Sequence, residues 1–207
     1  MISEQYKFAF VHIPKCGGTS VEKLFTDEFI KAPHVFGTIY KKDRPELYRW
    51  TTIRNSWDRI VSCYFYGIKR VGIDISFEEF VMEYIDDKGS KYAYTDENRF
   101  FGRDGHLIYV LDHNTKKPCI NFYVNLWNIK NHLKKLFKNL KIDLNILDKL
   151  EKHNPTNHDD YRSYYKNVKM INAVRKRYRG EIELFGFKFK NPKIFNNELV
   201  GKDLNIN

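Results

Sequence analysis

One stretch constrains the fold most: a β-rich run ends in a double-glycine turn and leads straight into a helical pattern. Tyr6–Ile13 is rich in aromatic and β-branched residues and has no room for a helix before Pro14, so it predicts a buried strand. The turn Pro14–Ser20 (PKCGGTS) follows, and Thr19–Phe29 then carries apolar residues at helical spacing. A strand, a glycine turn and a helix in this order are typical of parallel α/β sheets. We therefore predict an α/β protein with a central parallel sheet flanked by helices.

Further elements alternate along the chain as such a sheet requires. Tyr48–Ile53 predicts a second strand, and Asn55 or Ser56 can cap the helix that follows it. A helix is predicted at 76–86, where it opens with a Ser76–Glu79 capping box, and strands are predicted at 107–111 and 119–124 around a turn at 113–118. The remaining predictions are an amphipathic helix at 128–140, a loop at 152–162, a helix at 164–178, and a short strand or extended segment at 182–189. With 207 residues, we expect one domain over 1–190 and a loosely packed tail at 191–207.

The charge of the chain points to anionic partners. Lys and Arg number 36 against 26 Asp and Glu, which gives a formal net charge of +10. Such an excess attracts polyanions or phosphorylated small molecules. No run approaches the roughly 18 apolar residues of a membrane span, and the short apolar run at 8–13 does not make a signal-peptide core. Three scattered cysteines, Cys16, Cys63 and Cys119, predict neither a disulfide framework nor a zinc site, so we expect a reducing, cytoplasmic compartment.

The turn Pro14–Ser20 has the residue types of an anion-binding loop. Two glycines let backbone N–H groups approach an anion, and the start of the next helix adds its unsatisfied donors. Thr19 and Ser20 supply hydroxyl groups, and Lys15 supplies a mobile cation. Because the lysine precedes the glycines, the loop lacks the G-x-x-x-x-G-K-[ST] spacing of ATPases and GTPases. A glycine turn between a strand and a helix also occurs without any ligand.

A second motif, RNSWDR at 54–59, follows the strand at 48–53. Arg54 is predicted at the carboxyl edge of the sheet, where ligands of open α/β sheets bind. Ser62 follows about two helical turns later. A guanidinium group and a hydroxyl group suit a second phosphate. We interpret Asp58 and Arg59 as helix-cap and surface residues.

Together the two motifs resemble those of the sulfotransferases that use 3′-phosphoadenosine 5′-phosphosulfate (PAPS). FVHIPKCGGTSVEKLF is similar to their 5′-phosphosulfate loop, and TTIRNSWDRIVSCYFY is similar to their 3′-phosphate motif. The C-terminal HNPTNHDDYRSYYKNVKMINAVRKRY and ELFGFKF resemble the closing segment of the carbohydrate sulfotransferase branch. The resemblance spans Tyr6–Phe189 and implies a P-loop-NTPase-like sulfotransferase fold.

The resemblance also implies residue roles. Lys15 and the residues after it would hold the 5′-phosphosulfate, with Lys15 neutralising charge on the leaving oxygen. Arg54 and Ser62 would bind the 3′-phosphate, and a loop at 153–158 would close over the nucleotide with Arg162. His34 matches the position of the base for the acceptor hydroxyl. The implied residues are thus His34 and Lys15 for catalysis, and Lys15, Cys16, Gly17, Gly18, Thr19, Ser20, Arg54, Ser62 and Arg162 for the cosubstrate.

The implied reaction moves the sulfuryl group of PAPS to the hydroxyl group of an acceptor, a carbohydrate in this branch. By analogy with phosphoryl transfer, it needs in-line placement, charge stabilisation and a base, and it needs no metal here. Histidine is the usual base at neutral pH. Glu22 and Asp27 are weaker alternatives to His34, and we interpret His12 as a strand residue beside the loop. The remaining histidines are expected in turns or on polar helix faces: His106, His113, His132, His153 and His158.

Two departures from the family pattern and two other functions stay open. Ser56 stands where the family usually has proline, and Trp127 stands where it often has glutamate. An ATP-dependent phosphotransferase is the first alternative, which the missing lysine after the glycines disfavours. The second alternative is a basic nucleic-acid-binding module, although no RNP-type or zinc-finger signature is present. We expect acceptor-facing loops at Phe36–Glu46 and Gly67–Gly105, and neither carries a pattern that names the acceptor.

Overall fold

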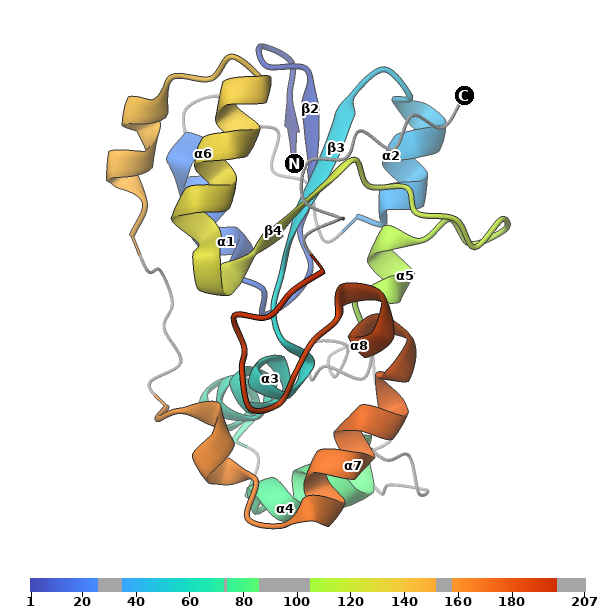
Figure 1. The fold of residues 1–207 in the computed structure, drawn as a ribbon, viewed down its shortest axis with the longest axis vertical. Coiled ribbons are helices and arrows are strands. Elements are labelled where there is room, and N and C mark those ends of the chain that lie inside the picture. The colour runs from blue at the N-terminus through green and yellow to red at the C-terminus, as the bar shows by residue number, and fades with distance from the viewer. Residues whose placement is uncertain (26–34, 73, 86–104, 152–157, 197–207) are drawn as a thin grey trace. The chain divides into compact units, whose positions relative to one another are not determined.

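The computed structural model describes residues 1–25, 35–72, 74–85, 105–151 and 158–196 (Figure 1). These residues belong to two compact units. The sheet unit comprises Met1–Ile53, His106–Asn154 and Asn196–Asn207, and the helical unit comprises Arg54–Gly105 and Pro155–Phe195. Within the described ranges, no helix is long and apolar enough to cross a membrane. The predicted α/β class is confirmed, and each unit is described by itself below.

The sheet unit contains a mixed sheet of four strands. The strands are β1 (Ile2–Ser3), β2 (Phe8–Val11), β3 (Tyr48–Ile53) and β4 (Phe122–Asn125), and they lie in that order. β2 pairs with β3 and β3 pairs with β4 in parallel, as predicted, with Val11 opposite Thr51. β1 is an antiparallel edge strand that the sequence did not predict. Its two residues are too few for a periodic pattern, and Lys7, at φ 51°, takes a left-handed conformation in the turn between β1 and β2.

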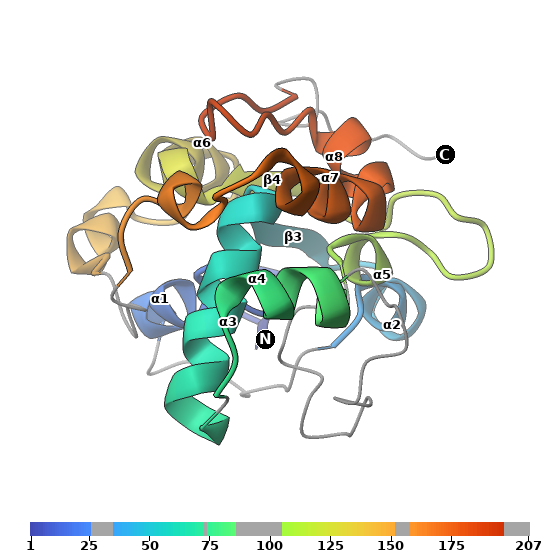
Figure 2. The same ribbon diagram turned by 90° about the horizontal axis from the view of Figure 1, so that it is seen from below.

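Helices flank this sheet on both faces (Figures 1 and 2). The helix α1 (Gly18–Glu22), its 3₁₀ extension η1 (Lys23–Phe25) and the helix α6 (Ile129–Asn139) pack on one face. The side chains that meet there are buried and come from alternate positions of the strands, chiefly Phe8, Phe10, Trp50, Phe122 and Val124. Burying each such side chain contributes about 1.5–3 kcal/mol. The helices α2 (Gly37–Asp43) and α5 (Leu107–Val110) pack on each other at the other face, where a Cβ at Gly37 would lie 2.7 Å from the carbonyl oxygen of Tyr109.

Three sequence predictions fail in the sheet unit. The segment 107–111, predicted as a strand, is the helix α5, in which the N–H group of Leu111 donates to the carbonyl of Leu107 at 2.9 Å. Only an isolated antiparallel bridge between Leu111 and Pro118 remains of the expected hairpin. The strand predicted at 119–124 begins at Phe122, and the N–H group of Cys119 donates instead to the carbonyl of Val110. The loop predicted at 36–46 contains α2. The amphipathic helix predicted at 128–140 is confirmed as α6.

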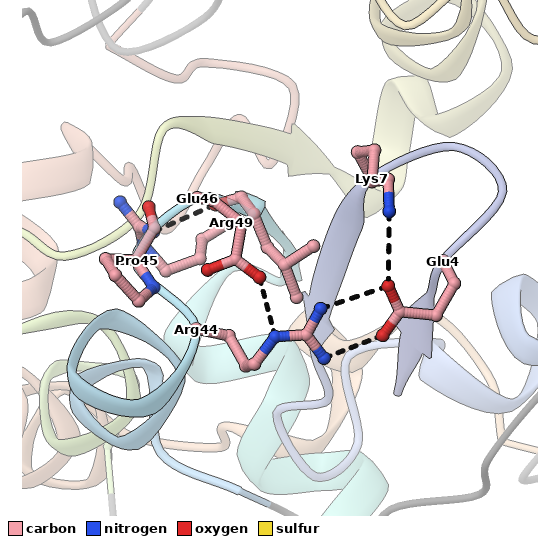
Figure 3. A network of polar contacts seen from close by, with 7 residues as sticks. Glu4, Lys7, Arg44, Pro45, Glu46 and Arg49 are labelled. Carbon is pink, nitrogen blue, oxygen red and sulfur yellow. Dashed lines mark hydrogen bonds and ion pairs between the residues drawn. The ribbon is translucent and has the colours of Figure 1, made fainter.

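An ion network holds the turn before β2 to the segment after α2 (Figure 3). Arg44 donates to both carboxylate oxygens of Glu4, at 2.7 and 3.0 Å, and its Nε donates to Glu46 at 2.6 Å. The Arg44 guanidinium lowers the pKa of Glu4 and of Glu46, chiefly through these hydrogen bonds. Both carboxylates are exposed and Arg44 is only partly buried, so the network contributes modestly to stability.

The helical unit is organised around a long helix and the C-terminal segment. Its elements are α3 (Ser56–Val71), α4 (Phe77–Glu79), the π-helical turn η2 (Phe80–Ile85), the 3₁₀ helix η6 (Tyr161–Tyr164), α7 (Val168–Arg177) and α8 (Arg179–Phe185). The side chain of Asn55 caps α3 by accepting from the N–H group of Trp57, as predicted. The capping box of Ser76 and Glu79 is also confirmed. Trp57 then donates from its indole to the carbonyl of Ile171, which ties α3 to α7.

The C-terminal part departs from the prediction at its helix boundaries. The segment 182–189, predicted as extended, contains most of α8, which Gly186 ends in the left-handed conformation at φ 67°. The helix predicted at 164–178 begins at Val168 with Asn167 as its cap, and part of the predicted loop forms η6. In the first part of the predicted tail, Phe195 is buried with its ring 6.2 Å from that of Phe185. Residues 197–207 lie outside the described residues.

A buried polar pair explains why serine occupies position 56. Its hydroxyl donates to the carboxyl group of Glu181 at 2.7 Å, and both side chains are buried. Proline, which the family pattern has there, cannot make this bond. The interpretation of Arg59 as a surface residue is wrong: Arg59 is only 1% exposed and lies 5.9 Å from the ring of Tyr178. Arg59 follows Ser56 by three residues, so both lie on the face of α3 that is turned into the unit.

Ser56→Ala should lower the free energy of unfolding by about 1.5–3 kcal/mol, the range for a hydrogen bond to a charged group, because the buried carboxyl group loses a donor. Denaturant titration measures this change. Ser163→Ala, which removes an exposed hydroxyl that donates to the carbonyl of Asp160, is the matched control and should cost less. The cost of Ser56→Ala should shrink in a Glu181→Gln background, and an equal cost in both backgrounds would contradict the pairing.

His132 anchors α6 to the end of β4, although the sequence suggested a polar helix face for it. Its side chain is buried, and Nδ1 accepts from the N–H group of Asn125 at 3.0 Å. A proton on Nδ1 would break this bond. Burial and the charge of Lys135 lower the pKa of His132 below its ordinary value. The folded state therefore favours the neutral imidazole.

Acidification should destabilise the fold through His132. Because the folded-state pKa is lowered, the unfolded chain binds the proton more readily, so stability present above the unfolded value of 6.5 is lost as the pH falls through the folded value. Urea unfolding at pH 7.5 and pH 5.5 measures the loss. His132→Asn is the control, since its amide oxygen can accept from Asn125 and does not titrate. This variant should lose less stability between the two pH values, and an equal loss would exclude His132 as the source.

Candidate functional site

The loop Pro14–Ser20 connects β2 to α1, which confirms the predicted order of strand, turn and helix. Lys15 and Gly17 both have left-handed backbones, at φ 64° and φ 78°, and together they turn the chain sharply. A lysine in this conformation is uncommon. The N–H groups of Ser20 and Val21 donate to the carbonyl of Gly17. The N–H groups of Gly18 and Thr19 precede these first helical bonds, so they are the donors that a helix start presents to a ligand.

Close packing explains both glycines of the loop. A Cβ on Gly18 would lie 2.2 Å from Cδ2 of His12, and a Cβ on Gly17 would lie 2.6 Å from Cδ1 of Leu126. No side chain fits at either position without a shift of its neighbour. Packing against the His12 ring therefore favours glycine at position 18, and the positive φ of 78° favours it at position 17. Because His12 and Leu126 hold the loop from two sides, its shape is set by the protein without a ligand.

Cys16 is a buried residue of this loop. Its Sγ atom lies 3.4 Å from Nε2 of His106, and both side chains are fully buried. His106 was expected in a turn or on a polar helix face, which implies an exposed side chain, and this expectation of exposure is wrong. His106 begins α5 and contacts the loop from a position 90 residues away in the sequence.

A carboxylate–imidazole pair lies beside the loop. Nδ1 of His12, which follows the last residue of β2, is 2.8 Å from Oε1 of Glu22, the last residue of α1. The sequence reasoning treated these two residues separately and did not predict the pair. Their spacing of ten residues across a strand, a turn and a helix was the available signal, since such a unit brings both ends of its turn together.

The second motif places Arg54 among polar and aromatic side chains of the helical unit. Its NH2 group donates to Oδ1 of Asp58 at 2.7 Å and lies 3.4 Å from Nε2 of His158. The side chain of Arg54 is 13% exposed. Asp58, interpreted from the sequence as a cap, is thus the ion partner of Arg54 one helical turn away. Ser62 follows on α3 and is buried.

His158 was predicted as the end of the loop that closes over the nucleotide, and its contact with Arg54 was not predicted. Its ring stacks on Phe65 at 5.6 Å, and Phe65 makes an edge contact with Tyr164 at 5.1 Å. The end of the loop predicted to close over the nucleotide therefore meets Arg54. The signal was its place in HNPTNHDDYRSYY, the segment that already carried the resemblance.

Arg162 contacts other residues than Arg54 does. Its guanidinium donates to both carboxylate oxygens of Asp160 and to the carbonyl of Lys190, and its side chain is 47% exposed. The structure brings Arg54 together with His158 and does not add Arg162 to their contacts. His34 and the segment 152–157 lie outside the described residues.

In the part of the chain that the structure describes, no group of three His, Cys, Asp or Glu side chains could hold a metal ion. Comparison of the chain with protein-family models, curated proteins and solved structures found no match. The function is therefore argued from the residues themselves.

Gly18→Ala should destabilise the protein by about 1–3 kcal/mol, the usual cost of overpacking, because the new methyl group meets the His12 ring. Thermal or urea unfolding measures the change. In a His12→Ala background the same substitution should be much less harmful, because the ring is gone. Equal costs in the two backgrounds would mean that another neighbour of Gly18 sets the limit.

Proposed function

We propose that this protein is a sulfotransferase that moves the sulfuryl group of PAPS to the hydroxyl group of a carbohydrate acceptor. The observation that carries the proposal is the order of the two motifs on neighbouring strands. β2 and β3 pair in parallel, so both strands end at the same edge of the sheet. The loop with Lys15 follows β2, and Arg54 is the residue after β3. Ligands of open α/β sheets bind at this edge.

The loop supplies groups that suit the 5′-phosphosulfate. Lys15 provides a cation, Thr19 and Ser20 provide hydroxyl groups, and the first N–H groups of α1 provide backbone donors. As the bond between sulfur and the acceptor oxygen forms, the bond from sulfur to the bridging oxygen breaks, and the electron pair stays on the 5′-phosphate. Charge thus grows on that oxygen, and Lys15 stabilises it more in the transition state than in the ground state. No step requires a metal.

The groups around Arg54 suit the 3′-phosphate. A guanidinium group has five N–H donors in a planar fork that suits a phosphate, and its NH2 group donates to Asp58. His158 adds a second nitrogen at the same place, and Phe65 offers an aromatic face beside it. The carboxylate of Asp58 fixes the orientation of Arg54 and also repels an incoming anion. A phosphate dianion must therefore supply more attraction than this repulsion costs.

One observation favours nucleic-acid binding as a second candidate function. A groove of about 370 Å³ on α6 is lined by Asn128, Asn131, His132, Lys134, Lys135 and Lys138. Its lysines form a basic surface that a polyanion can contact. Binding of single-stranded RNA that weakens steeply with salt and is lost in Lys135→Ala would support this function. A sulfotransferase requires neither result.

Calorimetric titration with PAP, the desulfated product, tests the sulfotransferase proposal. PAP should bind in the micromolar range, and EDTA should not change its affinity. Arg54→Ala should weaken PAP by about 2–4 kcal/mol, because a charge-assisted contact to the 3′-phosphate is lost.

ADP, which lacks the 3′-phosphate, is the matched ligand control and should bind Arg54→Ala and wild-type protein almost equally. Arg44→Ala, in the surface ion network of Figure 3, is the protein control and should leave PAP affinity unchanged. An absence of heat with PAP, or a PAP affinity that depends on added metal, would contradict the proposal.

A further inference from the structure

The pair of His12 and Glu22 is partly shielded from solvent and joins two elements. His12 follows β2 and Glu22 ends α1, and their side chains are 14% and 19% exposed. The 2.8 Å distance joins Nδ1 of the ring to one carboxylate oxygen. A carboxylate at Nδ1 holds the proton on that nitrogen and leaves Nε2 as the basic atom of the ring.

The ring of His12 lies directly against the loop. A Cβ on Gly18 would come within 2.3 Å of Nε2 as well as meeting Cδ2, so the ring takes the space that any side chain there would need. Gly18 is the first residue of α1 and is a neighbour of Thr19 in the candidate phosphosulfate loop. The basic nitrogen of the pair is therefore beside the backbone to which the sulfuryl donor is proposed to bind.

Other ionisable groups face this pair from β1 and α2. The α-amino group of Met1 donates to the hydroxyl of Tyr40 at 2.7 Å, and the charge of Glu22 acts on both groups. Burial lowers the pKa of the amino group to about 6 and raises the pKa of Tyr40 to about 12. Near neutral pH both groups are thus mostly uncharged. These two groups therefore add little charge beside Glu22 near neutral pH.

We propose that His12 is the base that accepts the proton of the acceptor hydroxyl and that Glu22 is its positioning residue. The inference rests on the proposed sulfotransferase function. As the acceptor oxygen attacks sulfur, its proton passes to Nε2 of His12, and the 5′-phosphate of PAP departs with the electron pair of the broken bond. Glu22 stabilises the imidazolium that forms. The imidazolium then releases its proton to water, which restores the free base.

His12→Asn separates this role from a structural one. The Asn amide nitrogen can still donate to Glu22 at the position of Nδ1, but the side chain has no atom that takes a proton at the position of Nε2. A role limited to the hydrogen bond with Glu22 predicts that this variant works normally. A role of the ring in shaping the loop beside Gly18 predicts weaker PAP binding. The catalytic role predicts that release of PAP from PAPS, with water as the acceptor, falls by about 10²–10⁴-fold, the usual contribution of a general base. PAP affinity by calorimetry should stay within a few-fold of wild type.

Further measurements sharpen the test. Wild-type turnover should fall in acid as the base is protonated, and this limb should vanish in His12→Asn. Transfer from p-nitrophenyl sulfate to PAP should fall far less in the variant, because the phenolate departs without a proton.

Glu22→Gln should also slow PAP release from PAPS, because an amide can donate to Nδ1 and hold the wrong tautomer. His113→Asn, on an exposed turn, is the control histidine and should behave as wild type.

The outcomes are distinguishable. Wild-type protein that does not bind PAP would refute the sulfotransferase proposal itself. Protein that binds PAP but releases none from PAPS, or a His12→Asn variant with normal turnover, would overturn the inference alone. If His34→Asn removes the acid limb while His12→Asn keeps it, the base is His34 and the inference is likewise overturned.

Discussion

The contact between the His12 ring and Gly18 determines where the first helix starts on the sheet. The ring fills the space of a side chain at position 18, so α1 can approach β2 closely only because that residue is glycine. Leu126, which follows β4, presses on Gly17 from another side. The loop between β2 and α1 is therefore shaped by packing, and its donors are held in place at no entropic cost when a ligand binds. The candidate phosphosulfate loop and the candidate base both depend on this one contact.

Local signals predicted the parts of the fold whose causes are local. The strands at 6–13 and 48–53 and the caps at Asn55 and Ser76 follow from a few adjacent residues. The failures have tertiary causes or depend on short ambiguous runs. LIYV at 107–110 has strand-like composition, yet it forms α5, whose first turn His106 joins to the loop through Cys16. A single arginine after a helix start is usually exposed, and only the fold shows that Arg59 faces inward.

The candidate site also has parts that local sequence predicts and parts that it does not. Its motifs are contiguous, so the sequence could point to Lys15–Ser20 and to Arg54. The pairings within it join residues that are far apart or that lie in different elements. Cys16 meets His106 across 90 residues, and Arg54 meets His158 across 104. No pattern in a single sequence encodes such contacts, because they arise only when the sheet and the helices pack. Ser56 differs from the proline of the sulfotransferase pattern that the chain resembles. Its hydrogen bond to Glu181 explains why serine is useful at this position.

A carboxylate stands beside three of the candidate groups: Asp58 at Arg54, Glu22 at His12 and Asp160 at Arg162. In a chain of net charge +10, these three carboxylates do not neutralise the overall positive charge. Their effect is local. Each fixes the orientation of a long or rotatable group before any ligand arrives, and each weakens the attraction of that group for ordinary anions. A ligand must then bring concentrated negative charge in the right geometry, as a phosphate dianion does. The carboxylates thus orient the cationic groups and also make them discriminate against anions of lower charge.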